Sequence, residues 1–205
     1  MKNHELLYIF DDLVVVAIGD AYKPAEDTWL IYTYLTDLRA RAHTCVDMGS
    51  GTGILGARVL KNGSAKRCVF LDVLGDALES TRRTLAANNL SSRGLVVSSD
   101  GDFLRERSVE LVVSNPPYLP AHGRMVEDVA TEGGPRGHET IEFFTRLASS
   151  ALHPGGLYVL LYSSLSGEEE VRRILQEKGF TCSVKNYKKL FFETLYLAEC
   201  VRNED

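Results

Sequence analysis

Short apolar runs alternate with amphipathic segments along the 205 residues of the chain. Runs rich in Val, Ile, Leu, Tyr and Phe predict strands, and segments whose apolar residues recur every three or four positions predict helices. The expected strands cover residues 6–10, 13–18, 44–48, 67–71, 95–98, 109–114, 156–162, 181–188 and 190–201. The expected helices cover residues 26–38, 54–61, 76–88, 139–152 and 168–178.

The order of these elements predicts the fold class. Between residues 44 and 114 they run strand, helix, strand, helix, strand, strand, with short connections. Near-continuous apolar strands of this kind are typical of a parallel sheet covered on both faces by crossover helices. The last two strands flank a turn at Lys188 and Lys189. We therefore expect an α/β fold with a mostly parallel, seven-stranded sheet and a C-terminal antiparallel hairpin.

The length of the chain predicts one domain over residues 1–205, and its composition is that of a soluble globular protein. We expect an N-terminal extension over about residues 1–25. A net charge of −5 and a pI near 5.6 argue against non-specific binding to nucleic acid. No apolar run approaches the roughly 18 residues of a membrane span, and the N-terminus lacks a signal-peptide pattern. We expect a cytoplasmic protein without a membrane partner. A fraction of it in the nucleus is compatible with this expectation.

The four cysteines are Cys45, Cys68, Cys182 and Cys200. None belongs to a C-x-x-C motif, and their spacing does not match a metal site. Because two of them lie in apolar strand-like runs, we expect reduced thiols in the core of a cytosolic protein, and no metal site.

A glycine-rich turn follows the first central strand. Asp47 precedes Gly49, Gly51 and Gly53, and a helical pattern begins directly after them. Glycines permit positive φ and close approach of a ligand, and the first amides of a helix have no intrahelical acceptor. Read as G-T-G-I-L-G with Asp72 21 residues beyond Gly51, the stretch fits a dinucleotide site. Read as D-x-G-x-G-x-G, it resembles motif I of S-adenosylmethionine-dependent methyltransferases, and the glycines do not decide.

Polar side chains gather where the central strands end. Asp47, Asp72 and Asn115 each end one strand, and Asp100 and Asp102 follow another. The carboxyl ends of parallel strands meet at one edge of the sheet, where ligands bind in open α/β folds. We therefore expect these side chains to surround one ligand site.

The most specific motif is Asn115-Pro116-Pro117-Tyr118, after the fourth central strand. Two successive prolines lack amide donors and force a stiff turn at the end of the strand. The Asn115 side-chain carbonyl and the Pro116 backbone carbonyl can then accept both hydrogens of a planar amide or ring amine, while Tyr118 stacks over it. Such positioning raises the effective concentration of a weak nucleophile. The alternative is a rigid turn without chemistry.

These motifs together resemble the HemK/PrmC family of protein-glutamine methyltransferases. The matching residues are D-M-G-S-G-T-G, Asp72 and S-N-P-P-Y. Y-K-P-A-E-D-T at residues 22–28 and E-G-G-P-R-G at residues 132–137 resemble its short archaeal and eukaryotic branch. The resemblance covers about residues 20–200, and Lys23 departs from it because the branch usually has Glu there.

The resemblance implies a class I Rossmann-like methyltransferase that uses S-adenosylmethionine. Its substrate would be the glutamine of the GGQ motif in the class-1 translation release factor, methylated at N5. It further implies a heterodimer with a small zinc-binding activator subunit. Open alternatives are nucleic-acid adenine-N6 or histone-lysine methylation, a nucleotide-binding oxidoreductase and a non-catalytic scaffold; the acidic chain makes a nucleic-acid partner the weaker expectation.

Carried over onto matching positions, the resemblance also implies roles for individual residues. The methionine part of the cofactor would be held by Asp47, Gly49, Gly51 and Gly53, and enclosed by Tyr22, Asp27 and Thr28. Asp72 would accept from the ribose hydroxyls, and Asp100 or Asp102 from the adenine amine, with Asp100 favoured. Asn115, Pro116 and Tyr118 would form the acceptor-amide pocket, with Asn115 also beside the cofactor.

Other residues are expected to have simpler roles. Arg136 and His138, in the irregular stretch 119–138, are candidates for steering the release factor, although charges in exposed loops are more often merely solvated. We expect Trp29 to belong to the core. We expect Phe191 and Phe192 to pack the terminal strands.

Overall fold

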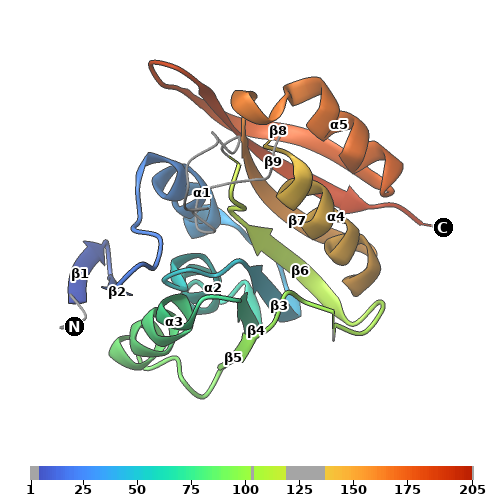
Figure 1. The fold of residues 1–205 in the computed structure, drawn as a ribbon. Helices are drawn as coiled ribbons and strands as arrows, with labels where there is room; N and C mark the ends of the chain where they lie inside the picture. The colour runs from blue at the N-terminus through green and yellow to red at the C-terminus, as the bar shows by residue number, and fades with distance from the viewer. Residues whose placement is uncertain (1–4, 103, 119–136, 205) are drawn as a thin grey trace.

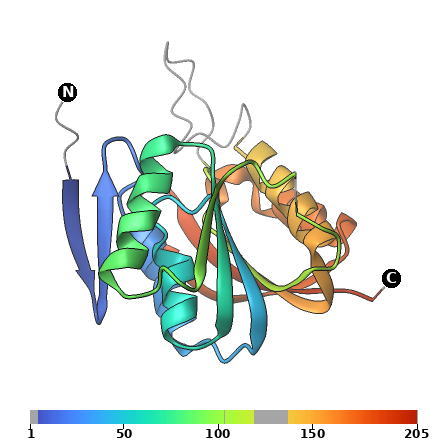
Figure 2. The ribbon, with the colours of Figure 1, turned by 90° about the horizontal axis from the view of Figure 1, so that it is seen from below.

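The computed structural model describes residues 5–102, 104–118 and 137–204. Its centre is a seven-stranded sheet with helices on both faces (Figures 1 and 2). The strands, in spatial order, are β5 (Gly94–Ser98), β4 (Ala65–Asp72), β3 (Ala42–Met48), β6 (Val109–Ser114), β7 (Leu152–Ser163), β9 (Thr194–Arg202) and β8 (Phe180–Lys189). The helices are α1 (Glu26–Asp37), α2 (Ile54–Lys61), α3 (Gly75–Ala87), α4 (Glu139–Ala151) and α5 (Glu168–Glu177).

Burial on both faces explains the near-continuous apolar strands. In β3, Cys45 packs in the core under α1, α2 and α3, whereas Val46 packs in the core under α4 and α5. The strands β5, β4, β3, β6 and β7 are parallel to one another, and β9 is antiparallel to both β7 and β8. The predicted fold class is confirmed. The largest differences in bounds are at β7, which begins at Leu152, and β9, which begins at Thr194.

The tip of the β8–β9 hairpin corrects one expectation. Phe191 and Phe192 do not pack the terminal strands, because their side chains are 91% and 85% exposed. The last paired residues of the hairpin are Lys189 and Thr194. Both phenylalanines therefore lie in the turn, beyond the sheet face that could bury them.

A separate two-stranded sheet, β1 (Glu5–Phe10) with β2 (Leu13–Ile18), lies beside α3. Polar side chains spaced four residues apart on α3 and at its end accept hydrogen bonds from alternate backbone amides at and just beyond β2. The four bonds, each 2.9–3.0 Å long, run from Val14 to Asn88, Val16 to Thr84, Ile18 to Ser80 and Asp20 to Asp76. The helix thus satisfies backbone donors that a third strand would otherwise pair.

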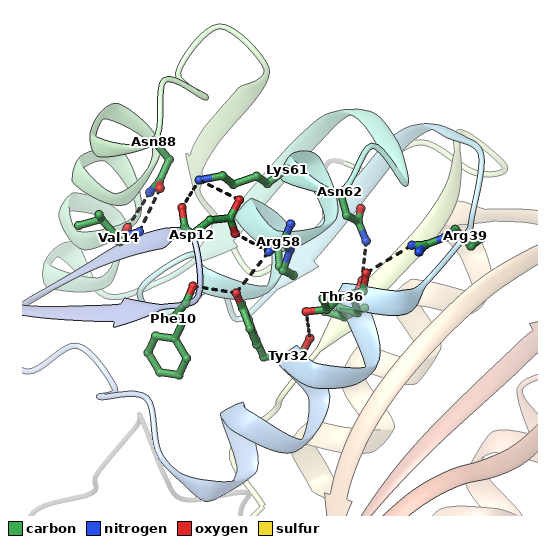
Figure 3. Close-up of polar contacts among 11 residues, drawn as sticks. Phe10, Asp12, Val14, Tyr32, Thr36, Arg39, Arg58, Lys61, Asn62 and Asn88 are labelled. Carbon is green, nitrogen blue, oxygen red and sulfur yellow. Dashed lines mark hydrogen bonds and ion pairs between the residues drawn. The ribbon is translucent and has the colours of Figure 1, made fainter.

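The turn between β1 and β2 is fixed to α2 (Figure 3). Arg58, only 7% exposed, donates to Asp12 Oδ1 at 2.8 Å and to the Tyr32 hydroxyl at 3.3 Å. Tyr32 in turn donates to the Phe10 carbonyl at 2.9 Å, and Lys61 donates to the Asp12 carbonyl. A buried guanidinium needs such partners to offset its desolvation.

Trp29 and the cysteines also differ from expectation. Trp29 is 45% exposed and stacks on Tyr32, with ring centroids 5.7 Å apart, so it covers the core rather than belonging to it. The expectation of reduced thiols is wrong in this structure, because two disulfides pair the four cysteines, Cys45 with Cys68 and Cys182 with Cys200. Each pair occupies facing positions on neighbouring strands. Spacing along the chain does not reveal that register.

Within the described part of the chain, no helix is long and apolar enough to cross a membrane.

Candidate active site

The glycine turn at the carboxyl end of β3 forms one side of the site. Its glycines all have left-handed backbone conformations, with φ of +69° at Gly49, +53° at Gly51 and +74° at Gly53. The Gly51 amide donates to Asp72 Oδ2 at 2.8 Å, and Thr81 donates to the Gly51 carbonyl at 3.0 Å. These bonds fix the turn to β4 and α3. A Cβ at Gly51 would have its nearest neighbour, Tyr22 Cβ, at 3.9 Å, so the turn leaves room above it.

Asp47 lies beneath this turn and is completely buried. Its Oδ2 accepts from the Gly56 amide at 2.8 Å, whereas its Oδ1 is buried without a hydrogen-bond partner among the described residues. Burial and, to a smaller extent, the nearby Asp72 raise the pKa of Asp47 and the Gly56 amide lowers it, so that the pKa is about 8. A buried acceptor without a partner is costly. Asp47 Oδ1 is therefore suited to a cationic or hydrogen-bond-donating ligand.

Asp27 connects α1 to the Asn-Pro-Pro-Tyr corner. Its Oδ2 accepts from Asn115 Nδ2 at 2.8 Å, from the Tyr22 hydroxyl at 2.8 Å and from the Tyr118 hydroxyl at 3.3 Å. Its Oδ1 accepts from the Thr28 amide at 2.6 Å. Asp27 is 3% exposed, and donors surround both of its carboxylate oxygens. The sequence placed Asp27 with Tyr22 and Thr28, but it did not indicate the contact with Asn115.

Asn115 has two sides with different environments. Its Nδ2 donates to Asp27, whereas its Oδ1 is buried and has no hydrogen-bond partner among residues 5–102, 104–118 and 137–204. The backbone after it is held by Ser166, whose hydroxyl donates to the Tyr118 carbonyl at 3.2 Å. Burial and the Asp27 carboxylate raise the pKa values of Tyr22 and Tyr118 far above the usual range. Both phenols therefore remain protonated donors, and among the described side chains of this corner the buried acceptor without a partner is Asn115 Oδ1.

The remaining acids follow β4 and β5. Besides Gly51, the Leu74 amide donates to Asp72, at 3.0 Å to Oδ1. Asp102 accepts from the Ser99 hydroxyl at 3.2 Å, and Asp100 is exposed and accepts from the Asp102 amide at 3.4 Å. Asp72 is thus a fixed carboxylate beside the glycine turn. The choice between Asp100 and Asp102 for an adenine amine stays open.

Of the two candidates for steering the release factor, His138 lies among the described residues and Arg136 does not. His138 is 7% exposed and its Nε2 lies 3.9 Å from Glu170 Oε1, so it is not a solvated loop residue. Arg136 lies outside the described residues, as do the glycines at 123, 133 and 134. Thr81 and Ser166 hold the site together but were not predicted, because Thr and Ser in helical segments carry no distinctive pattern.

The residues present fit S-adenosylmethionine. Asp47 Oδ1 suits the ammonium group of the cofactor, and the open space at Gly51 allows its methionine part to approach the turn closely. The Asp72 carboxylate can accept hydrogen bonds from both hydroxyls of its ribose. No group of three His, Cys, Asp or Glu side chains among the described residues could hold a metal ion.

Comparisons with known proteins agree with this geometry. A family model described as the methyltransferase small domain matches residues 28–190. Similar curated proteins include the "Putative protein N5-glutamine methyltransferase" of Methanocaldococcus jannaschii, 29% identical over 89% of this chain and 92% of that protein. Methyltransferase HEMK2 of Homo sapiens is 28% identical over 87% and 88% of the two chains.

A solved structure is similar along almost its whole length. It is a chain of the E. cuniculi Mtq2–Trm112 complex, described as responsible for methylation of the eRF1 translation termination factor. It is 25% identical, covers 90% of this chain and 99% of that chain, and has a TM-score of 0.66. The resemblance to the protein-glutamine methyltransferases is confirmed by these relatives. With 28–190 matched by the family model, the chain belongs to the methyltransferase small domain family.

Proposed function

We propose that this chain transfers a methyl group from S-adenosylmethionine to the side-chain amide nitrogen of the glutamine in the GGQ motif of the class-1 translation release factor. The single observation that carries this proposal is Asn115 Oδ1, a buried acceptor at the corner after β6 that has no hydrogen-bond partner in the described part of the chain. A carboxamide N–H would supply the missing donor. The activities named for the M. jannaschii and E. cuniculi relatives support the choice of substrate.

In this proposal the cofactor lies over the glycine turn. Asp47 and the turn of Gly49, Gly51 and Gly53 hold the methionine part, Asp72 accepts from the ribose hydroxyls, and Asp100 or Asp102 accepts from the adenine amine. When bound, S-adenosylmethionine supplies an electrophilic methyl group on a cationic sulfur. Tyr22 and Thr28 belong to the same wall of the site, because both hydrogen-bond to Asp27.

The acceptor residues position a weak nucleophile. Asn115 Oδ1 and the Pro116 carbonyl accept the two hydrogens of the glutamine NH₂ and hold its nitrogen in one orientation. Tyr118 packs beside the amide plane, with its hydroxyl held by Asp27. The S–CH₃ bond breaks as the N–CH₃ bond forms, so the positive charge passes from the sulfur to the amide nitrogen, which then releases one of its protons to water. Neutral acceptors suffice at the start of transfer, because the proton leaves only after the nitrogen has gained the methyl group. Orientation of this kind is a major source of rate enhancement.

Asp27 has a separate part in this proposal. Its Oδ2 accepts from Asn115 Nδ2 and thereby fixes which end of the Asn115 amide faces the acceptor pocket. An amide that rotated by half a turn would present a donor to the substrate NH₂. Asp27 is therefore a positioning residue for Asn115.

The proposed assembly is a heterodimer with a small zinc-binding activator subunit. Support comes from the similar E. cuniculi chain, which was solved as a complex with Trm112. The experiment that tests the function is labelled-methyl transfer by the chain, co-purified with the activator subunit, to the release factor. Label is expected in the release factor, and none when the GGQ glutamine is replaced by alanine. Label in DNA or in histone lysine instead would overturn the proposal.

The buried Asp47 also predicts a pH dependence of stability. Since folding raises its pKa from 3.8 to about 8, the folded protein keeps a proton that the unfolded chain releases between these values. The contribution of Asp47 to the free energy of unfolding is therefore fully present below about pH 4 and declines as the pH rises towards 8. Urea unfolding of the ligand-free chain between pH 5 and pH 8 should show a shallower decline in Asp47→Asn. Parallel curves for the two proteins would contradict the assignment.

A further inference from the structure

The most exposed large apolar side chains of the described residues are Phe191 and Phe192. They pack edge to face against each other, with ring centroids 4.6 Å apart and ring planes at 83°. They form the tip of the β8–β9 hairpin, which projects from the sheet at the upper left of Figure 1. Two adjacent exposed aromatic rings are costly in water and are enriched where proteins meet.

The base of this tip is held in place. The Leu190 amide donates to the Glu193 carbonyl at 2.8 Å, and the Glu193 carboxylate accepts from the Ser163 hydroxyl. The Thr194 amide donates to the Ser164 hydroxyl at 2.9 Å. The rings are therefore presented from a hydrogen-bonded turn.

The same anchor connects the tip to the acceptor pocket. Ser164 begins a single 3₁₀ turn that ends at Ser166, and the Ser166 hydroxyl donates to the Tyr118 carbonyl. One short element thus holds both the hairpin tip and the Asn-Pro-Pro-Tyr corner. On the other side, Lys188 forms an ion pair with Glu26, the residue before Asp27. The position of the tip relative to the acceptor pocket is fixed from two directions.

We propose that Phe191 and Phe192 form a docking element for the protein substrate, next to the side chain that enters the acceptor pocket. This inference rests on the proposed function. A pocket for one side chain buries little area, whereas specific protein recognition buries roughly 800 Å² on each partner. The substrate must therefore also contact the protein surface around the acceptor pocket. The tip with Phe191 and Phe192 is part of that surface, because the 3₁₀ turn at Ser164–Ser166 joins it to the Tyr118 carbonyl.

The charge beside the rings indicates the chemistry of the partner surface. Lys189, two residues before Phe191, is exposed, whereas Lys188 is paired with Glu26. The occupant that fits is a folded protein that presents an apolar depression bordered by acidic side chains, close to its acceptor loop. Complementary charge of this kind accelerates association and fixes orientation.

The test compares two substrates for one double variant, Phe191→Ser/Phe192→Ser. The substrates are the intact release factor and a short peptide containing its GGQ loop, and the enzyme is the complex with the activator subunit. The KM for the intact release factor is expected to rise by roughly thirtyfold, the scale of losing interface hot-spot side chains. The kcat, the KM for the peptide and the affinity for S-adenosylmethionine are expected to stay unchanged. Since both rings are exposed, the thermal midpoint should also be unchanged.

The matched control is Leu7→Ser/Ile9→Ser on β1, where the two side chains are 65% and 79% exposed. A normal KM in this control supports the inference, and an equal rise in both double variants overturns it. If the KM for the release factor is the same in the wild type and in Phe191→Ser/Phe192→Ser, docking at the tip is overturned while the proposed function stands. Absence of transfer by the wild type overturns the proposed function and this inference with it. Loss in the variant of binding to phosphatidylserine vesicles, or of self-association, would assign the tip to a membrane or to a second copy and overturn the inference.

Discussion

Replacing Asn115 by alanine is expected to lower kcat by roughly 10²–10³-fold, the scale of losing one preorganised hydrogen-bonding group in an active site. The variant removes the partnerless Oδ1, so one hydrogen of the acceptor amide loses its partner and the nitrogen loses its fixed direction. Asp27 keeps its bonds from Tyr22, Tyr118 and Thr28, so the corner should stay folded. Affinity for S-adenosylmethionine should therefore remain close to that of the wild type.

The measurements are single-turnover methyl transfer to the release factor and calorimetric titration with S-adenosylmethionine. Asn203→Ala is the matched control, because it makes the same chemical change at an exposed position. Asn203 directly follows β9 and accepts a hydrogen bond from the Thr181 hydroxyl on β8. Its rate should equal that of the wild type. An Asn115→Ala enzyme with wild-type turnover would remove the chemical basis of the proposed acceptor pocket.

Asp27→Asn is expected to have the second largest effect, a fall in kcat of about 10²-fold or more. Both oxygens of Asp27 accept hydrogen bonds, one from the Thr28 amide and the other from Asn115 and two phenols. An asparagine must turn its NH₂ towards one of these sets of donors. If it faces Asn115, that amide rotates to accept from it, and Asn115 then presents its NH₂ to the substrate. The acceptor pocket would keep its shape, but Asn115 would present a hydrogen-bond donor where the substrate NH₂ needs an acceptor.

A purely structural role for Asp27 would show in stability rather than in the rate. We therefore expect a lower kcat with little change in KM for the release factor or in affinity for S-adenosylmethionine. Asp37→Asn makes the same chemical change on the same helix, at an exposed position, and should leave all three values unchanged. Equal kcat values for Asp27→Asn and the wild type would show that another contact orients Asn115.

Most of the fold was predictable because it depends on local patterns. Apolar runs and helical periodicity placed the strands and helices of the sheet within a few residues. The exceptions depend on the third dimension. Cys45 and Cys68 are 23 residues apart and meet through the register of β3 and β4. Phe191 and Phe192 look like strand residues in the sequence, and their exposure follows from where hairpin pairing stops.

The site was predictable as a set of residues but not as a set of contacts. Strand ends and glycine spacing predicted Asp47, Asp72 and Asn115 at one edge. The bond between Asp27 and Asn115 joins positions 88 residues apart, one in the first turn of α1 and the other directly after β6. Asp47 Oδ1 and Asn115 Oδ1 are buried without a partner among the described residues, and this could be identified only once their neighbours had been placed.

The polar side chains on α3 that accept hydrogen bonds from the amides of β2 limit the length of this strand. Four residues of helix advance about 6.0 Å, whereas two residues of strand advance about 6.6–6.8 Å. The mismatch of about 0.7 Å at each step accumulates to about 2 Å over the three steps from Asp76 to Asn88. All four side chains still form bonds of 2.9–3.0 Å, so they accommodate this accumulated mismatch. A longer β2 would drift out of reach of the helix, so lengthening this sheet would require a true neighbouring strand.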